Sequence, residues 1–224
     1  MSDDAALLAA ILAHPDEDTP RLMYADWLQE NGQPDRAEFI RIQCDPTAEE
    51  AAEDRAAELE ERNRAKWLAG LPQFPDARWE FRRGFPEYLD TTGELMLERY
   101  EAFARLPWLR CLSLHELHNS SVRDFANRPW NPQWIELELQ AHPTGLLFES
   151  DYDHTPALTA IAHCPQVVQL HRLHLSMFDF TPHAIHVFAE SRHLAELDNI
   201  TLSFVYEGDF TPLRERFGER LVIG

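Results

Sequence analysis

The sequence predicts an α/β protein in which an α-helical N-terminal module, residues 1–75, precedes a short solenoid with a parallel sheet, residues 76–224. Two observations predict the second part: a short apolar phrase recurs in it, and helical patterns separate the copies. Strands that alternate with helices favour parallel pairing through right-handed crossovers. The first part carries helix start and stop signals with apolar residues at helical spacing, which is typical of packed helices.

The recurring phrase reads apolar-x-x-apolar-x-apolar. It occupies residues 109–114, 134–139, 170–175 and 197–202. Recurrence every few tens of residues is the signature of a solenoid, whose sheet offers a platform for partners. The predicted strand centres are Leu112/Leu114, Leu137/Leu139, Leu173/Leu175, Ile200/Leu202 and Leu221/Ile223.

The N-terminal module should hold four helices. The first covers residues 3–13, with Ser2 as its cap; the second opens at Thr19 and stops at Asn31-Gly32, where glycine suits a left-handed cap. A third starts at Pro34, and a fourth opens at Thr47 with a capping box and ends at Gly70. The many Ala and Glu residues of the fourth indicate one narrow buried seam, anchored by Leu59, Trp67 and Leu68.

Further along the chain, a hairpin is expected around residues 79–85, followed by a first strand near 88–91. Predicted helices cover residues 94–106, 121–127, 155–163, 182–191 and 211–217. The longest insertion, residues 141–155, contains Pro143, Gly145 and several acidic residues. We expect it to form an exposed loop, and such loops often carry binding residues.

Three stretches of the N-terminal module resemble a known family: LAAILAHPDEDTPRL at 8–22, YADWLQENG at 24–32 and RAEFIRIQ at 36–43. They are similar to the bacterial repeat-companion domain, a module that commonly precedes leucine-rich or other repeats. The stretch WEFRRGF at 79–85 resembles the entry into such repeats, and LRERFGERL at 213–221 resembles a last repeat. The resemblance implies an architecture and carries over no activity, substrate or catalytic residue.

The repeats depart from the leucine-rich pattern at one place. Leucine-rich repeats usually hold Asn three residues after the last Leu of the phrase, and this chain has Leu117, His142, Phe178 and Val205 there. The bends must therefore be stabilised in another way, such as by packing. We expect a short, flattened leucine-rich-repeat-like solenoid and not a regular horseshoe.

Strand alternation predicts which side chains face away from the core, because successive residues of a strand point to opposite faces. With a uniform register, Glu136 lies beside Arg172 and Glu138 beside His174, within cross-strand reach. A mixed polar face of this kind suits a protein partner, and a solvated face without a partner is the alternative. The predicted partner-binding residues are Ser113, His115, Glu136, Glu138, Gln140, Arg172, His174, Ser176, Thr201 and Ser203, with Cys111 and Asn199 in the same rows.

Charge and composition restrict the classes of partner. The net charge is −19, and the acidity is spread: residues 1–75 hold 17 acidic against 7 basic residues, and residues 76–224 hold 22 against 13. Such a field repels phosphate backbones, so direct nucleic-acid binding is not expected. The chain has no apolar run of the ~20 residues that cross a bilayer. Three dispersed cysteines and a start without a signal-peptide pattern predict a cytoplasmic protein.

Candidate catalytic and metal-binding residues are few. His115, Glu138 and His174 could meet on the exposed face, but the spacing fits a metal site loosely, and neither a metal nor another cofactor is predicted. His163 and Cys164 are adjacent, which does not suit a nucleophile and its base on a helix. We therefore predict a non-enzymatic protein–protein interaction or adaptor module that acts through the sheet face. The alternatives are a recognition subunit of a larger defence or signalling complex and a metal-dependent enzyme of unfamiliar type.

Overall fold

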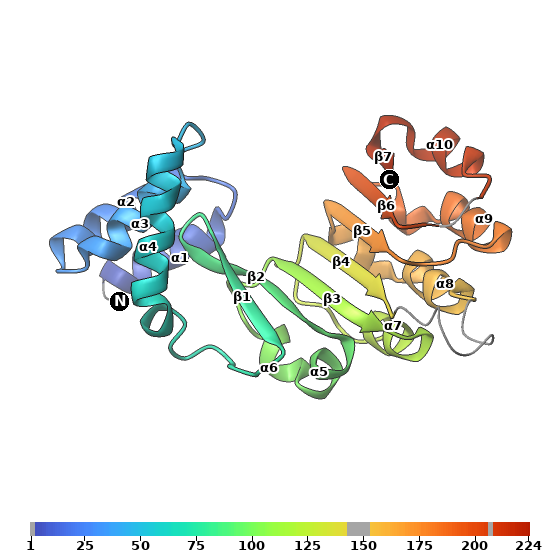
Figure 1. The fold of residues 1–224 in the computed structure, drawn as a ribbon, viewed down its shortest axis with the longest axis horizontal. Helices are drawn as coiled ribbons and strands as arrows, with labels where there is room; N and C mark the ends of the chain where they lie inside the picture. Colours follow the sequence, from blue (N-terminus) through green and yellow to red (C-terminus); the bar gives the residue numbers. More distant parts are fainter. Residues whose placement is uncertain (1–2, 143–152, 206–207) are drawn as a thin grey trace. The chain divides into compact units, whose positions relative to one another are not determined.

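The computed structural model describes residues 3–142, 153–205 and 208–224. It confirms an α/β protein with helices at the N-terminus and a seven-stranded sheet in which the strands lie in the order β1 to β7 (Figure 1). By packing, the chain divides into two compact units, residues 1–73 with 79–87 and residues 74–78 with 88–224. In the described part of the chain, no helix has the length and apolar character required to span a bilayer.

Four helices form most of the first unit: α1 (Asp3–Ala13), α2 (Thr19–Glu30), α3 (Pro34–Gln43) and α4 (Glu50–Trp67). Their apolar stripes pack α1 on α2, α2 on α3 and α3 on α4. The buried centre includes Ile11, Leu28, Phe39 and Leu59. All four predicted helices are confirmed, and Gly32 has the positive φ, 75°, of a left-handed stop after α2.

The hairpin β1 (Ala77–Arg82) and β2 (Phe85–Thr92) turns through Arg83 and Gly84. Both turn residues have positive φ, 47° and 84°, as a two-residue type I′ turn requires. A Cβ on Gly84 would lie 2.3 Å from Cγ1 of Ile40, so the close approach of the turn to α3 also demands glycine. Phe81 and Phe85 are buried in the first unit, where the guanidinium of Arg36 lies over both rings.

The second unit contains the parallel strands. They are the rest of β2 with β3 (Cys111–Leu117), β4 (Glu136–Ala141), β5 (Arg172–Ser176), β6 (Asn199–Ser203) and β7 (Leu221–Ile223), and each pairs in parallel with the next. Connecting them are the helices α5 (Gly93–Glu98), α6 (Tyr100–Ala104), α7 (Asn119–Ala126), α8 (Thr155–His163), α9 (Pro182–Glu190) and α10 (Thr211–Phe217), with the 3-10 segments η1 (Pro165–Gln169), η2 (Arg192–Leu194) and η3 (Gly218–Arg220).

The helices of the second unit form one layer beside the sheet. α7 packs on α8, α8 on α9 and α9 on α10, so that successive connections lie side by side (Figure 1). One face of every central strand is buried: the paired leucines and isoleucine of β3 to β6 are at most 2% exposed. The predicted shared interior of the apolar phrases is confirmed, with Leu112 beside Leu137, Leu137 beside Leu173 and Leu173 beside Ile200.

The turns that follow the strands lack the asparagines that stabilise the equivalent bends of leucine-rich repeats. Leu117 and Phe178 occupy two of the positions at which leucine-rich repeats usually hold Asn. Both side chains are buried, so packing stabilises these two bends, as expected. The residue before each, Glu116 or Met177, has a left-handed φ of 57° or 63°, and Phe204 after β6 has 51°. A left-handed non-glycine residue is uncommon, and its recurrence at three strand exits marks one shared turn design.

Several predicted boundaries were wrong. The fourth helix starts at Glu50 and not at Thr47, because both the N–H and the hydroxyl of Thr47 bond to Asp45 Oδ1 and hold an extra turn. The N-cap position of α2 is Asp18 and not Thr19, and the Asp18 side chain forms no capping hydrogen bond. The strand expected near 88–91 is the second half of β2, and the helix expected over 94–106 is divided at Arg99 into α5 and α6. Ser2 and most of the predicted 141–155 loop lie outside the described residues.

Candidate functional site

The exposed face of the parallel strands, called the sheet face below, carries the predicted rows. The register pairs Cys111 with Glu136, Glu136 with Arg172 and Arg172 with Asn199. A second row runs through Ser113, Glu138, His174 and Thr201. These two rows follow from strand alternation and one uniform register, and both are confirmed.

The third predicted row is wrong at one end. Gln140 pairs with Ser176 and Ser176 with Ser203, but the register of β3 and β4 shifts between Leu114 and Leu117, so the one-to-one pairing of His115 with Gln140 is lost. On the other side of β3, His115 pairs with Thr92 of β2. The shift is a bulge that places one extra residue in β3, where Glu116 has its left-handed φ. A bulge depends on tertiary pairing, and the alternation of the phrase gave no sign of it.

Polar contacts join neighbouring strands across the sheet face. Arg172 Nη1 donates to Glu136 Oε1 at 2.9 Å, and the Tyr88 hydroxyl donates to Glu138 Oε2 at 3.2 Å. A hydrogen bond of 2.6 Å joins His174 Nε2 to Ser203 Oγ. Burial raises the pKa of Tyr88 to about 12, so the phenol remains protonated and a donor at neutral pH.

The contacts leave some charges accessible and hold others in place. The Arg172 side chain is 64% exposed, whereas that of Glu136 is 12% exposed, so the pair presents its cation outward. Ser113, His115, Glu138, His174, Ser176, Thr201 and Ser203 are half-buried, Gln140 is exposed and Cys111 is buried. The face is therefore a surface of fixed polar groups and not an enclosed cavity.

The sheet face extends beyond the predicted residues. Tyr88 lies beside Cys111, Asp90 beside Ser113, and Val222 of β7 beside Thr201. Val222 is 47% exposed and adds an apolar position at the end of the second row. The sequence could have predicted these residues, because it predicted both outer strands and the same alternation of side chains applies to them.

Two of the three candidate metal ligands form other contacts, and so do other histidines of the described residues. Glu138 accepts from Tyr88 and His174 bonds to Ser203. The ring of His118 stacks on His142, with centroids 4.9 Å apart, and His186 lies 3.2 Å from Glu190. Within the described ranges, no three His, Cys, Asp or Glu residues are grouped so that they could hold a metal ion.

A second feature of this unit lies where β2, β3 and β4 end. A hollow of about 370 Å³ is lined by residues that include Thr92, Glu116, His118, Asp124 and His142. Open parallel sheets often bind ligands beyond the carboxyl ends of their strands. Nothing in the lining favours one class of ligand, because carboxylates, imidazoles and hydroxyls are mixed in it.

The cysteines lie in surroundings that suppress thiolate chemistry. Cys111 and Cys164 are each 3% exposed, and burial raises the pKa of Cys164. Cys44 is more accessible, but burial, followed by the charge of Asp18, raises its pKa to about 11. The thiolate is the reactive form, so none of these positions favours a nucleophile.

We expect Cys44 to be alkylated slowly. At pH 8 a thiol of pKa about 11 holds about two-hundredfold less thiolate than an ordinary cysteine of pKa ~8.5, so the rate with iodoacetamide should fall by a similar factor. The rate should rise about tenfold per pH unit up to that pKa. Peptide mass spectrometry measures it, with the protein in urea as the control. Alkylation of folded Cys44 as fast as the urea control would contradict the expectation.

Compared with known proteins, the chain matches no family model, no curated protein and no solved structure. The resemblance to the repeat-companion domain therefore stays a prediction.

Proposed function

We propose that the protein is a non-enzymatic adaptor that binds another protein through the sheet face. The observation that carries this proposal is the aligned pair of polar rows across four strands. Cross-strand contacts hold Glu136, Arg172, Glu138 and His174 in a defined pattern. A pattern of fixed charges and hydrogen-bonding groups favours a partner with a complementary surface. Such complementarity contributes more to the specificity of binding than to its affinity.

We further propose that residues 76–224 form a short leucine-rich-repeat-like solenoid. Three features support this: each strand neighbours the next along the chain, one helical layer connects them, and a left-handed turn residue recurs at three strand exits. Repeats stacked in this way place equivalent residues in rows, which suits them for binding extended surfaces. The sheet face would then be the recognition surface of the solenoid.

The test is comparative capture. In the test variant, Glu136, Glu138, Arg172 and His174 are all changed to Ala. The amount of partner protein that it captures from native cells, measured by quantitative mass spectrometry, should fall at least tenfold. A matched variant carries Arg123→Ala and Asp124→Ala on α7, both exposed and away from the two rows.

The control variant should retain the partners, and both variants should keep the far-UV spectrum of the unchanged protein. The four residues are half-buried or exposed, so their removal should leave the aliphatic interior in place. Partners that remain on the fourfold variant at the unchanged level would refute the assigned surface.

A further inference from the structure

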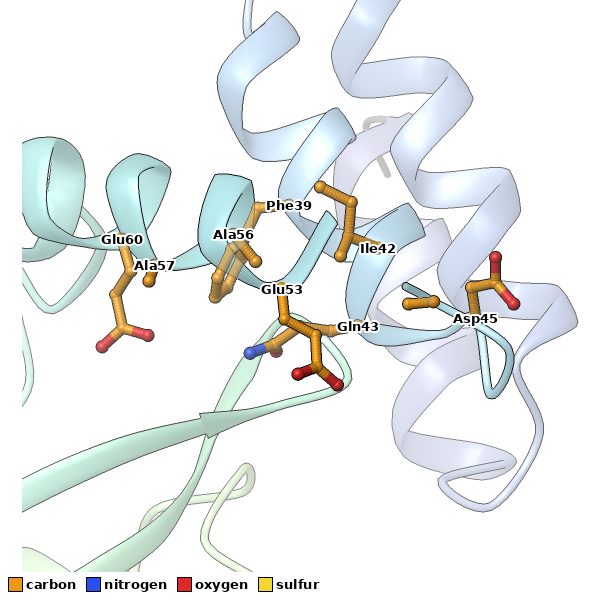
Figure 2. Close-up of a pocket in the computed structure, with 9 residues that line it drawn as sticks. Phe39, Ile42, Gln43, Asp45, Glu53, Ala56, Ala57 and Glu60 are labelled. Atoms are coloured by element: carbon orange, nitrogen blue, oxygen red, sulfur yellow. The ribbon is translucent and has the colours of Figure 1, made fainter. Parts of the chain in front are cut away.

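A hollow in the first unit lies between α3 and α4, and it belongs to neither of the features described above. Its volume is about 350 Å³. The helical stripe Glu53, Ala56, Ala57 and Glu60 forms the α4 side, and Phe39 and Ile42 lie on the α3 side (Figure 2). Residues spaced by three and four share one face of a helix, so the stripe is a direct consequence of the sequence.

The hollow exists because the middle of this stripe is alanine. A face packed against another helix usually carries Leu or Ile, and the seam of α4 has its large anchor at Leu59, which is fully buried. Ala56 and Ala57 end at Cβ and leave the space in front of Phe39 unfilled. Phe39 and Ala56 are buried beneath the hollow, and the half-buried Ile42 and the exposed Ala57 give its floor apolar surface.

Carboxylates lie along this apolar floor. Asp45, Glu53 and Glu60 all line the hollow, and Figure 2 shows them one after another along it, from α4 to the segment after α3. Asp45 and Glu53 are exposed. Bonds from Thr47 lower the pKa of Asp45, so its carboxylate is ionised at neutral pH.

Of the three rim carboxylates, the arginines of α4 pair with Glu60 alone in the described part of the chain, which leaves Asp45 and Glu53 as the charged part of the rim. Arg55 pairs with Glu38 and Glu58, Arg62 pairs with Asp35, and Arg64 pairs with Glu60. Among the described residues, no basic side chain forms an ion pair with Glu53 or Asp45. The excess of negative charge in residues 1–75, 17 acidic against 7 basic residues, strengthens the field at the rim.

An apolar floor with a carboxylate rim is the complement of one side-chain chemistry. Arginine and lysine bury an aliphatic stem and keep a cationic head at the surface. Arginine fits better, because its planar guanidinium donates to two carboxylate oxygens at once. We propose that the hollow between α3 and α4 receives an arginine side chain from a basic segment of a partner protein. The N-terminal module would then hold a binding site of its own, separate from the sheet face.

The probe is a capped five-residue peptide, Ala-Ala-Arg-Ala-Ala, titrated into the full-length protein and followed by amide chemical shifts in two-dimensional NMR. We expect saturable shifts at Gln43, Asp45, Ala56 and Ala57. The same peptide with citrulline in place of arginine keeps the shape and loses the charge, and it should bind at least tenfold more weakly. A higher salt concentration should also weaken the binding of the arginine peptide, because salt screens exposed charges.

Three variants decide whether the hollow is responsible. Glu53→Gln should weaken the arginine peptide about fivefold, since it removes one rim charge that has no internal partner. Glu58→Gln removes the same charge from α4 at a residue outside the lining, and it should change binding less than twofold. Ala57→Leu should fill the hollow and abolish binding while the melting temperature stays the same or rises, because Ala57 is exposed.

Equal binding of the citrulline peptide would overturn the proposal, as would shifts that leave α3 and α4 unaffected. Unchanged affinity in both Glu53→Gln and Ala57→Leu would also overturn it. None of these readouts involves the sheet face, so the proposal stands or falls apart from the adaptor function proposed above.

Discussion

Replacement of Arg21 by Met should destabilise the first unit by about 3–5 kcal/mol, because it removes the buried cation that Arg21 places against the carboxylate of Glu87. The Arg21 and Glu87 side chains are 0% and 5% exposed, and Arg21 Nη2 lies 2.5 Å from Glu87 Oε1. Desolvation lowers the pKa of Arg21, while the charge of Glu87 opposes that shift. The pair therefore links α2 to β2 inside a low-dielectric interior.

The free energy of unfolding in urea measures the effect, with circular dichroism as the probe. Glu87→Leu should be similarly destabilising, since it leaves a buried guanidinium that also donates to the carbonyls of Pro15 and Arg83. The stability loss of the double variant Arg21→Met/Glu87→Leu should be smaller than the sum of the two single losses by at least about 2 kcal/mol, because neither charge of the pair remains in it. Strict additivity of the two losses would contradict a coupled buried pair.

This pair shows what sequence patterns could not predict. Arg21 lies in an amphipathic helix, where an arginine is ordinarily assigned to the exposed face. Glu87 lies 66 residues away on a strand of the hairpin. No periodicity connects the two, because their partnership depends on how the hairpin packs on α2, and the sequence of neither element records that contact.

The strands and the first two rows of the sheet face could be predicted, because both depend on local rules. The leucine phrase marks the buried positions, and alternation then assigns Glu138 and His174 to the other face. The bulge at Glu116 broke the third row, since one extra residue in β3 shifts every later pairing. The hollow between α3 and α4 was not predicted: the sequence indicated a narrow buried seam on α4, and the unfilled space beside Phe39 depends on how the two helices pack.

Leu173→Ala tests whether the phrases share one interior, and it should cost about 3 kcal/mol. Leu173 is 0% exposed and lies between Leu137 of β4 and Ile200 of β6, so a cavity there is walled by both neighbouring strands. The surrounding side chains are part of a continuous sheet, which limits how far they can collapse into the space. The lost transfer free energy of the side chain and the cavity that remains therefore both contribute to the loss of stability.

The matched control is Val222→Ala in β7, which removes an aliphatic side chain from the opposite face. Val222 is 47% exposed and lies in the row of Thr201, so its loss should cost less than about 0.5 kcal/mol. Urea unfolding of both variants supplies the comparison. A Leu173→Ala cost no larger than that of Val222→Ala, after scaling for the smaller side chain, would show that the leucines do not share an interior, and the polar rows would then lose the rigid support that the adaptor function requires.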